Sequence, residues 1–111
     1  MNNLFLLITQ DQQRILTSDF IYKSLTVPEG FTFNGNSVPK WARFFLGQYD
    51  YIQASCVHDY LYSQNAEYST TRYYADNIYR EILINLGFKK YKANIAYICI
   101  RLFGKKFYKK G

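Results

Sequence analysis

The only histidine of the chain, His58, is followed directly by Asp59, and Tyr62 comes one helical turn after His58. Within a predicted helix, His58 and Tyr62 lie on the same face. An imidazole that takes a proton from water acts as a general base, and a carboxylate on its other nitrogen fixes the tautomer. These residue types indicate a candidate catalytic site centred on His58.

Asp76 is the candidate for the supporting carboxylate. It lies in the next predicted helix, and two antiparallel helices joined by a loop at residues 64–68 would bring its carboxylate near His58. We therefore predict His58, Asp76 and Tyr62 as the catalytic group, with Arg72 as structural support.

A cation site is a second possibility in the same region. Asp59 points elsewhere on its helix and could bind a hard cation such as calcium, the one candidate cofactor, together with loop carbonyl groups. The loop at residues 34–37 could supply those carbonyls. Asn34, Gly35 and Ser37 are therefore candidate substrate-binding or metal-binding residues.

Each of these residues also has a structural explanation. A lone helical histidine is more often a hydrogen-bonded structural residue, and Asp76 has Arg72 and Arg80 one turn away as ordinary helix partners. The loop at 34–37 could be a turn that caps a helix at Pro39. Access discriminates the two explanations: a catalytic His58 opens onto a pocket, whereas a structural one is enclosed.

The elements that must position these residues change type along the chain. Runs at residues 4–9 and 14–27 predict two or three short strands, and residues 31–33 predict one more extended piece. Helices are predicted at 40–46, at 51–63, from a cap within 69–71 to about Leu86, and at 91–103. The last of these is apolar nearly all round, so we expect a core helix.

This order predicts an α+β fold, with a small N-terminal antiparallel sheet or hairpin followed by a three- to four-helix bundle. The 111 residues fit a single domain, 1–111, with residues 1–33 mainly β, 39–104 helical and 105–111 a basic tail. A hydrophobic content of 49% excludes a disordered chain. Two cysteines are too few for a disulfide framework, and a buried thiol pair or one bridge both remain open for Cys56 and Cys99. We expect no signal peptide and no transmembrane segment.

Charge is unevenly distributed in this chain of net charge +6, because no Asp or Glu follows Glu81. The basic residues beyond it are Lys89, Lys90, Lys92, Arg101, Lys105, Lys106, Lys109 and Lys110. Such a block can bind anionic lipid, nucleic acid or an acidic protein, or it can be a solvated terminus.

Several linked motifs resemble the phage and prophage family catalogued as domain of unknown function 1353. They cover nearly the whole chain: Val27-Pro28-Glu29-Gly30-Phe31, Asn34-Gly35-Asn36-Ser37-Val38-Pro39-Lys40, Val57-His58-Asp59-Tyr60-Leu61-Tyr62, Arg72 with Ala75-Asp76, and Arg101-Leu102-Phe103-Gly104. That family usually has Asp at the position of Asn34. The resemblance implies a virion or a host cytoplasm as the location.

Residues 54–83 also resemble, more locally, the helix pair of secreted calcium-dependent phospholipases. That resemblance implies His58 as the water-activating base, Asp59 as the calcium ligand and Asp76 as the support of the histidine. The dense disulfides of those enzymes are absent, and residues 34–36 match their calcium loop poorly.

Two function hypotheses follow. The first is a small phage protein of virion or envelope context, which would contact other virion proteins or an anionic membrane surface. The second is a hydrolase of phospholipid or another envelope substrate, with His58 as base, Asp76 as its orienting group and Asp59-bound calcium. Nucleic-acid binding ranks last, because no recognisable module accompanies the charge.

Overall fold

The structure is a computed structural model that describes residues 1–11, 13–34, 52–63 and 71–108. The chain divides into two units, residues 1–34 and residues 35–111, and each is described by itself. The helix predicted at 40–46 and the loop predicted at 64–68 lie outside the described residues. The prediction of one domain remains a prediction.

The first unit contains a three-stranded antiparallel sheet in the order β1-β2-β5. Its strands are β1 (Leu6–Ile8), β2 (Arg14–Leu16) and β5 (Thr32–Phe33). Leu6 pairs with Leu16, and Arg14 pairs with both Ile8 and Phe33. Gly30, at φ 89°, lets the chain turn back so that its amide donates to the Leu16 carbonyl at 2.9 Å.

A separate hairpin joins β3 (Phe20–Tyr22) to β4 (Leu25–Val27). Its strands alternate buried and less buried side chains, with Phe20, Tyr22 and Leu25 among the buried ones, which is the period-two pattern of a half-buried strand. The run at 14–27 thus holds three strands. Lys23 reverses the chain by adopting a left-handed φ of 53°, which is uncommon for a residue with a side chain.

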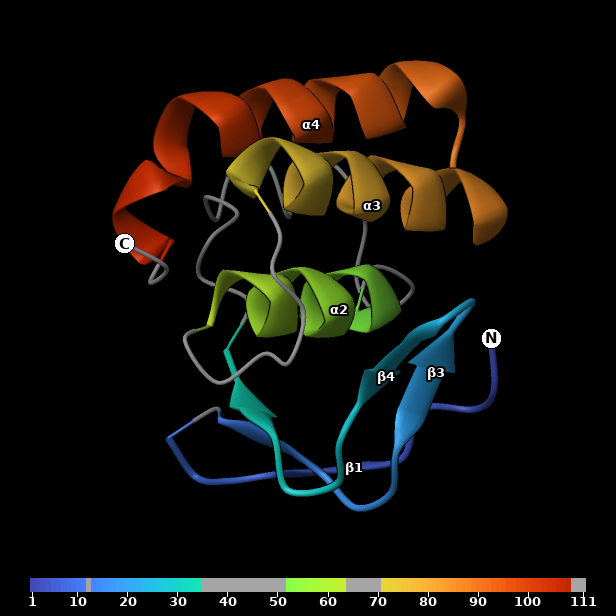
Figure 1. The fold of residues 1–111 in the computed structure, drawn as a ribbon, viewed down its shortest axis with the longest axis vertical. Helices are drawn as coiled ribbons and strands as arrows, with labels where there is room; N and C mark the ends of the chain where they lie inside the picture. Colours follow the sequence, from blue (N-terminus) through green and yellow to red (C-terminus); the bar gives the residue numbers. More distant parts are fainter. Residues whose placement is uncertain (12, 35–51, 64–70, 109–111) are drawn as a thin grey trace. The chain divides into compact units, whose positions relative to one another are not determined.

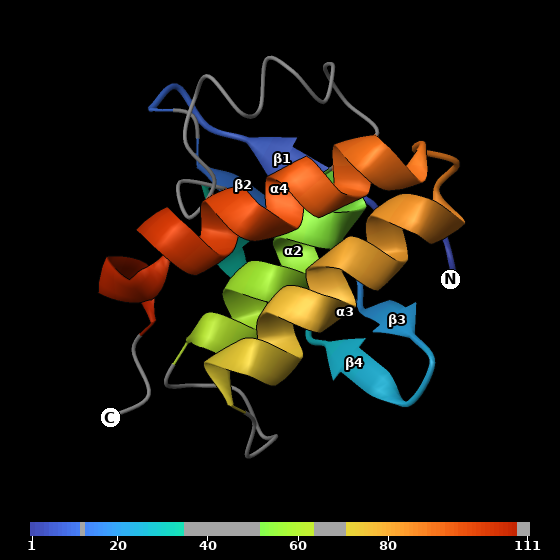
Figure 2. The same cartoon turned by 90° about the horizontal axis from the view of Figure 1, so that it is seen from above.

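In the second unit, helix α2 (Ile52–Tyr62) packs against α3 (Arg72–Asn85), and α3 packs against α4 (Lys90–Phe103). Figure 1 shows α3 between the other two, and Figure 2 gives the same three helices from above. Eight of the eleven α2 residues are buried, so this helix contributes most of its surface to packing. Helix α3 ends before Gly87, whose φ of 101° is left-handed.

Helix α4 buries one face only, which corrects the expectation of a core helix. Small side chains, Ala93 and Ala96, are buried together with Cys99 and Ile100, and they let α4 approach α3 closely. Ile98 and Leu102 are exposed. A sequence that is apolar all round does not show which face has a neighbour. The short 3-10 helix η1 (Lys105–Phe107) continues the chain.

The α+β fold predicted from the sequence is confirmed, with N-terminal antiparallel strands followed by helices. The bounds of α2, α3 and α4 lie within one or two residues of the predicted ones. Cys56 and Cys99 are both free and buried. No helix in the described part of the chain is long and apolar enough to span a membrane.

The start of α3 gives a first test. Thr71 is its N-cap, and the hydroxyl accepts a hydrogen bond from the Tyr74 amide at 3.1 Å. We expect Thr71→Ala to lower the free energy of unfolding by about 1 kcal/mol, because that amide loses its acceptor. Urea denaturation measures the change. Thr71→Ser keeps the oxygen and should lose much less; equal losses in the two variants would contradict the cap.

Candidate functional site

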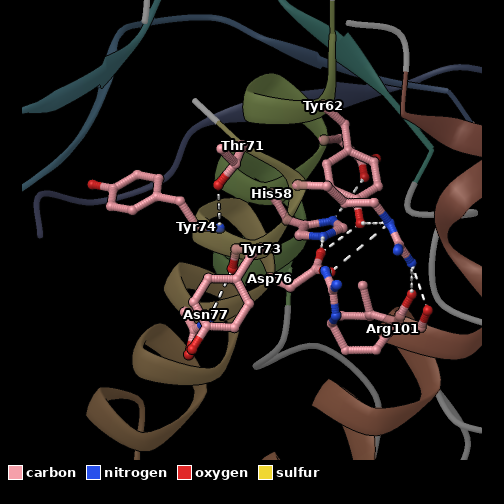
Figure 3. A network of polar contacts seen from close by, with 11 residues as sticks. His58, Tyr62, Thr71, Tyr73, Tyr74, Asp76, Asn77 and Arg101 are labelled. Carbon is pink, nitrogen blue, oxygen red and sulfur yellow. Dashed lines mark hydrogen bonds and ion pairs between the residues drawn. The ribbon is translucent and has the colours of Figure 1, made fainter. Parts of the chain in front are cut away.

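Helices α2 and α3 bring His58, Tyr62 and Asp76 together in the interior of the second unit (Figure 3). His58 Nε2 lies 2.8 Å from Asp76 Oδ1, and the Tyr62 hydroxyl donates to the same oxygen at 2.5 Å. His58 and Asp76 are fully buried, and Tyr62 is 2% exposed. The spacing of one helical turn between His58 and Tyr62 allows both to reach one carboxylate oxygen.

Two arginines complete the surroundings of this carboxylate. Arg101, from α4, donates from Nη1 to the second oxygen, Asp76 Oδ2, at 2.7 Å. Arg72 lies with Nε 4.0 Å from Oδ2 and donates from Nε to the Tyr62 hydroxyl at 3.2 Å. Side chains from three helices therefore meet at Asp76.

Arg72 also binds the end of α4. Its Nη2 donates to the carbonyls of Ile100 and Arg101 at 2.6 and 2.8 Å. The last carbonyls of a helix have no partner within it and carry its partial negative charge, so a guanidinium there is favourable. Arg72 thus connects the Tyr62 hydroxyl to the last carbonyls of α4.

The charge states follow from these contacts. Burial acts to lower the pKa of His58, but hydrogen bonds and charge interactions with Asp59 and Asp76 outweigh it, and the pKa lies above 6.5. For Asp76, burial acts to raise the pKa, but His58, Tyr62 and Arg101 outweigh it, and the pKa lies below 3.8. These contacts therefore favour the charged forms of both His58 and Asp76.

Aromatic rings and one glycine enclose this pair. The ring centroid of His58 lies 4.0 Å from that of Tyr62 and 5.2 Å from that of Tyr79. Tyr108 packs edge-on against Tyr62, with 5.2 Å between the ring centroids. A Cβ atom at Gly104 would lie 3.2 Å from the Tyr62 hydroxyl and 2.6 Å from the Ile100 carbonyl oxygen. Only glycine allows the chain to leave α4 this close to Tyr62.

Of the other predicted site residues, Asp59 and Asn34 belong to the described part of the chain. Asp59 lies beside the imidazole: its Oδ1 is 3.7 Å from His58 Nδ1, an ion-pair distance, and its side chain is 14% exposed. Asn34 follows β5 in the first unit, where its carbonyl accepts from Arg14 Nη1 at 3.2 Å. Gly35 and Ser37 lie outside the described residues. Among the residues that are described, no three His, Cys, Asp or Glu side chains gather as metal ligands.

Two members of the network were not predicted as site residues, Arg101 and Gly104. Arg101 is the only charged residue in the last three turns of a strongly apolar helix, and that isolation could have indicated a buried acidic partner. Arg80, considered as a partner of Asp76, instead donates to Asn94 at 2.5 Å. Gly104 carries no sequence signal beyond its place after the helix.

As it stands, the arrangement is suited to holding a charge pair more than to transferring protons. A general base must be unprotonated at the working pH, and the raised pKa of His58 moves that condition to higher pH. A base must also reach its substrate, but His58 is 0% exposed.

The charge pair predicts how stability depends on pH. Because the pKa of His58 is higher in the folded state than in the unfolded state, its interactions stabilise the fold fully below pH 6.5. This contribution is lost as the pH rises through the folded-state pKa. The lowered pKa of Asp76 stabilises the fold above 3.8, and this is lost as the pH falls through the folded-state pKa. We expect both contributions to be complete between pH 3.8 and 6.5. Urea unfolding across the pH range measures them.

Asp76→Asn is the matched control for this profile. The amide keeps the shape of the side chain but not its charge, so the loss of stability above pH 6.5 should become smaller than in wild type. A wild-type stability that does not fall as the pH rises above 6.5 would contradict the ion pair.

Gly104 gives a steric prediction. In Gly104→Ala the new methyl group would meet the Ile100 carbonyl oxygen, which already accepts from the Gly104 amide at 2.8 Å and from Arg72. We expect a loss of about 1–3 kcal/mol in the free energy of unfolding, as for other overpacked sites. Lys105→Ala, at the exposed next residue, should change it by about 0.5 kcal/mol or less. Similar effects of both substitutions would argue against close packing at Gly104.

Comparison with known proteins gives one match. The model of the family described as "Protein of unknown function (DUF1353)" matches residues 12–100, a range that contains the three described helices except the last turn of α4. No curated protein and no solved structure matches the chain. Since the family model covers most of the sequence, the chain belongs to the DUF1353 family.

Proposed function

We propose that this chain is a phage-encoded protein of virion or host-envelope context in which the His58–Asp76 network is a structural element and not a catalytic one. The observation that carries the structural role is the enclosure of the network. His58 and Asp76 are fully buried, and both oxygens of Asp76 accept hydrogen bonds or ion pairs from neighbouring helices. The phage setting rests on the linked motifs at residues 27–40, 57–62, 72–76 and 101–104.

The network has a clear structural task. Asp76 receives donors from α2 and α4, so one buried carboxylate specifies how three helices pack. A buried charge without its partners is costly, and helix arrangements that separate these groups are therefore disfavoured. Such a small, rigidly specified unit suits a protein that works through its surface.

A hydrolase remains the second candidate, because one observation favours it. Asp76 Oδ1 lies 2.8 Å from His58 Nε2, which is the contact that orients an imidazole in water-activating sites. Asp59 lies on the other side of the ring, 3.7 Å from Nδ1. In this candidate function a change of structure exposes His58 to a phospholipid or other envelope ester, with calcium at Asp59.

One experiment discriminates the two functions. Release of fatty acid from mixed anionic phospholipid vesicles is measured with and without calcium, for wild type, His58→Ala and Tyr62→Phe. Unfolding free energies are measured on the same samples. The structural role predicts no hydrolysis by wild type. It also predicts losses of about 3–5 kcal/mol in His58→Ala, which removes one of the charged partners of a buried carboxylate, and about 1.5–3 kcal/mol in Tyr62→Phe.

Calcium-dependent hydrolysis by wild type that disappears in a folded His58→Ala protein would overturn the structural role and establish the hydrolase. Should His58→Ala not fold, hydrolysis by Tyr62→Phe is compared with hydrolysis by wild type instead. This variant keeps the imidazole and removes one hydrogen bond. Immunoblots of purified phage particles and of host membrane and cytosol fractions test the setting. Detection in the cytosol fraction alone would contradict the virion or envelope setting and leave the host cytoplasm as the location.

A further inference from the structure

The outer surface of α4 combines exposed apolar side chains with lysines. Tyr91, Ile98 and Leu102 are 53%, 53% and 69% exposed, and Ile95 is partly buried. Residues 91, 95, 98 and 102 are spaced by four, three and four positions, so they form one stripe along the helix. We call these four residues the outer α4 stripe. The stripe lies opposite the buried face at Ala93, Ala96 and Ile100, whose partner is α3.

The charged residues of the chain segment that carries this stripe, 90–106, all have one sign. Lys90 and Lys92 flank its beginning, and Lys105 and Lys106, both exposed in η1, follow its end. No acidic residue occurs after Glu81. The charge of Arg101 is directed inward, to Asp76 at 2.7 Å, with the guanidinium also over the Tyr73 ring. Lysines therefore provide the surface charge around the stripe.

We propose that the outer α4 stripe binds the surface of an anionic phospholipid bilayer. An interfacial helix places apolar side chains at the boundary of the headgroups and acyl chains, while its lysines meet lipid phosphates. Ile98 and Leu102 supply the apolar part, and the lysines at both ends supply the charge. A second copy of this chain fits less well, because pairing two α4 helices would place lysines against lysines without a counter-charge.

This binding is independent of any catalysis at His58. The stripe lies on the face of α4 away from α3, whereas the network, among the described residues, reaches α4 through Arg101 and the carbonyls at its end. A failure of lipid binding would therefore leave the structural role of the network intact, and the reverse also holds.

Vesicle flotation of the full chain tests the proposal. The vesicles are phosphatidylcholine alone, or equal parts of phosphatidylglycerol and phosphatidylcholine. We expect binding to the anionic vesicles and weakening as salt is raised. Ile98→Ser with Leu102→Ser should weaken it at least tenfold, as should Lys105→Gln with Lys106→Gln. The residues of both pairs are exposed, so we expect the free energy of unfolding, measured by urea denaturation, to be the same in these variants as in wild type.

The chain offers a matched control in β1. Leu7 and Ile8 are 62% and 57% exposed, close to the values of Leu102 and Ile98. Leu7→Ser with Ile8→Ser removes similar apolar surface elsewhere and should leave lipid binding within about twofold of wild type.

Three outcomes would overturn the proposal. They are equal binding to phosphatidylcholine alone, equal weakening by the β1 pair, and absence of binding to either vesicle. Sedimentation velocity identifies the alternative: a dimer that Ile98→Ser with Leu102→Ser dissociates would assign the stripe to a second copy.

Discussion

The arrangement of the second unit depends on one buried carboxylate. Asp76 is fully enclosed, and a charge in that position is tolerated only when it is paired and hydrogen-bonded. Its partners come from α2, from α3 itself and from α4. Hydrophobic packing alone would leave the three helices free to slide by small amounts. The need to keep donors at both oxygens removes that freedom, which is a constraint on geometry more than a source of net stability.

The sequence predicted much of this fold because local signals agree with the global arrangement. Thr71 begins α3 and Gly87 follows its end, and both residue types mark helix termini. The separation of the strands at 14–27 was less predictable, since Lys23 adopts a left-handed conformation that its residue type does not favour. The face of α4 that is buried also could not be read, because apolar residues occur all round that helix.

For the site, the sequence supplied the members that share a helix face or belong to adjacent helices. His58 and Tyr62 are one turn apart, and Asp76, 14 positions after Tyr62 in the next helix, contacts both. Arg101 was missed as a partner because its contact with Asp76 spans 25 positions and depends on how α4 lies across α3. The enclosure of the site could not be predicted either, because His, Tyr, Asp and Arg side chains can line an open cleft or a closed core. Only the packing around them distinguishes the two.

The guanidinium of Arg72 connects the interior of this unit to its edge. It donates to the Tyr62 hydroxyl, whose proton is held by Asp76, and it also donates to the final carbonyls of α4. Loss of charge at Asp76 would weaken the hydrogen bond that it accepts from Tyr62, and then the hydrogen bond from Arg72 to Tyr62. The contacts of Arg72 with the last turn of α4 would weaken in turn. The fraying of an exposed helix end is thereby linked to the protonation of a group that solvent does not touch.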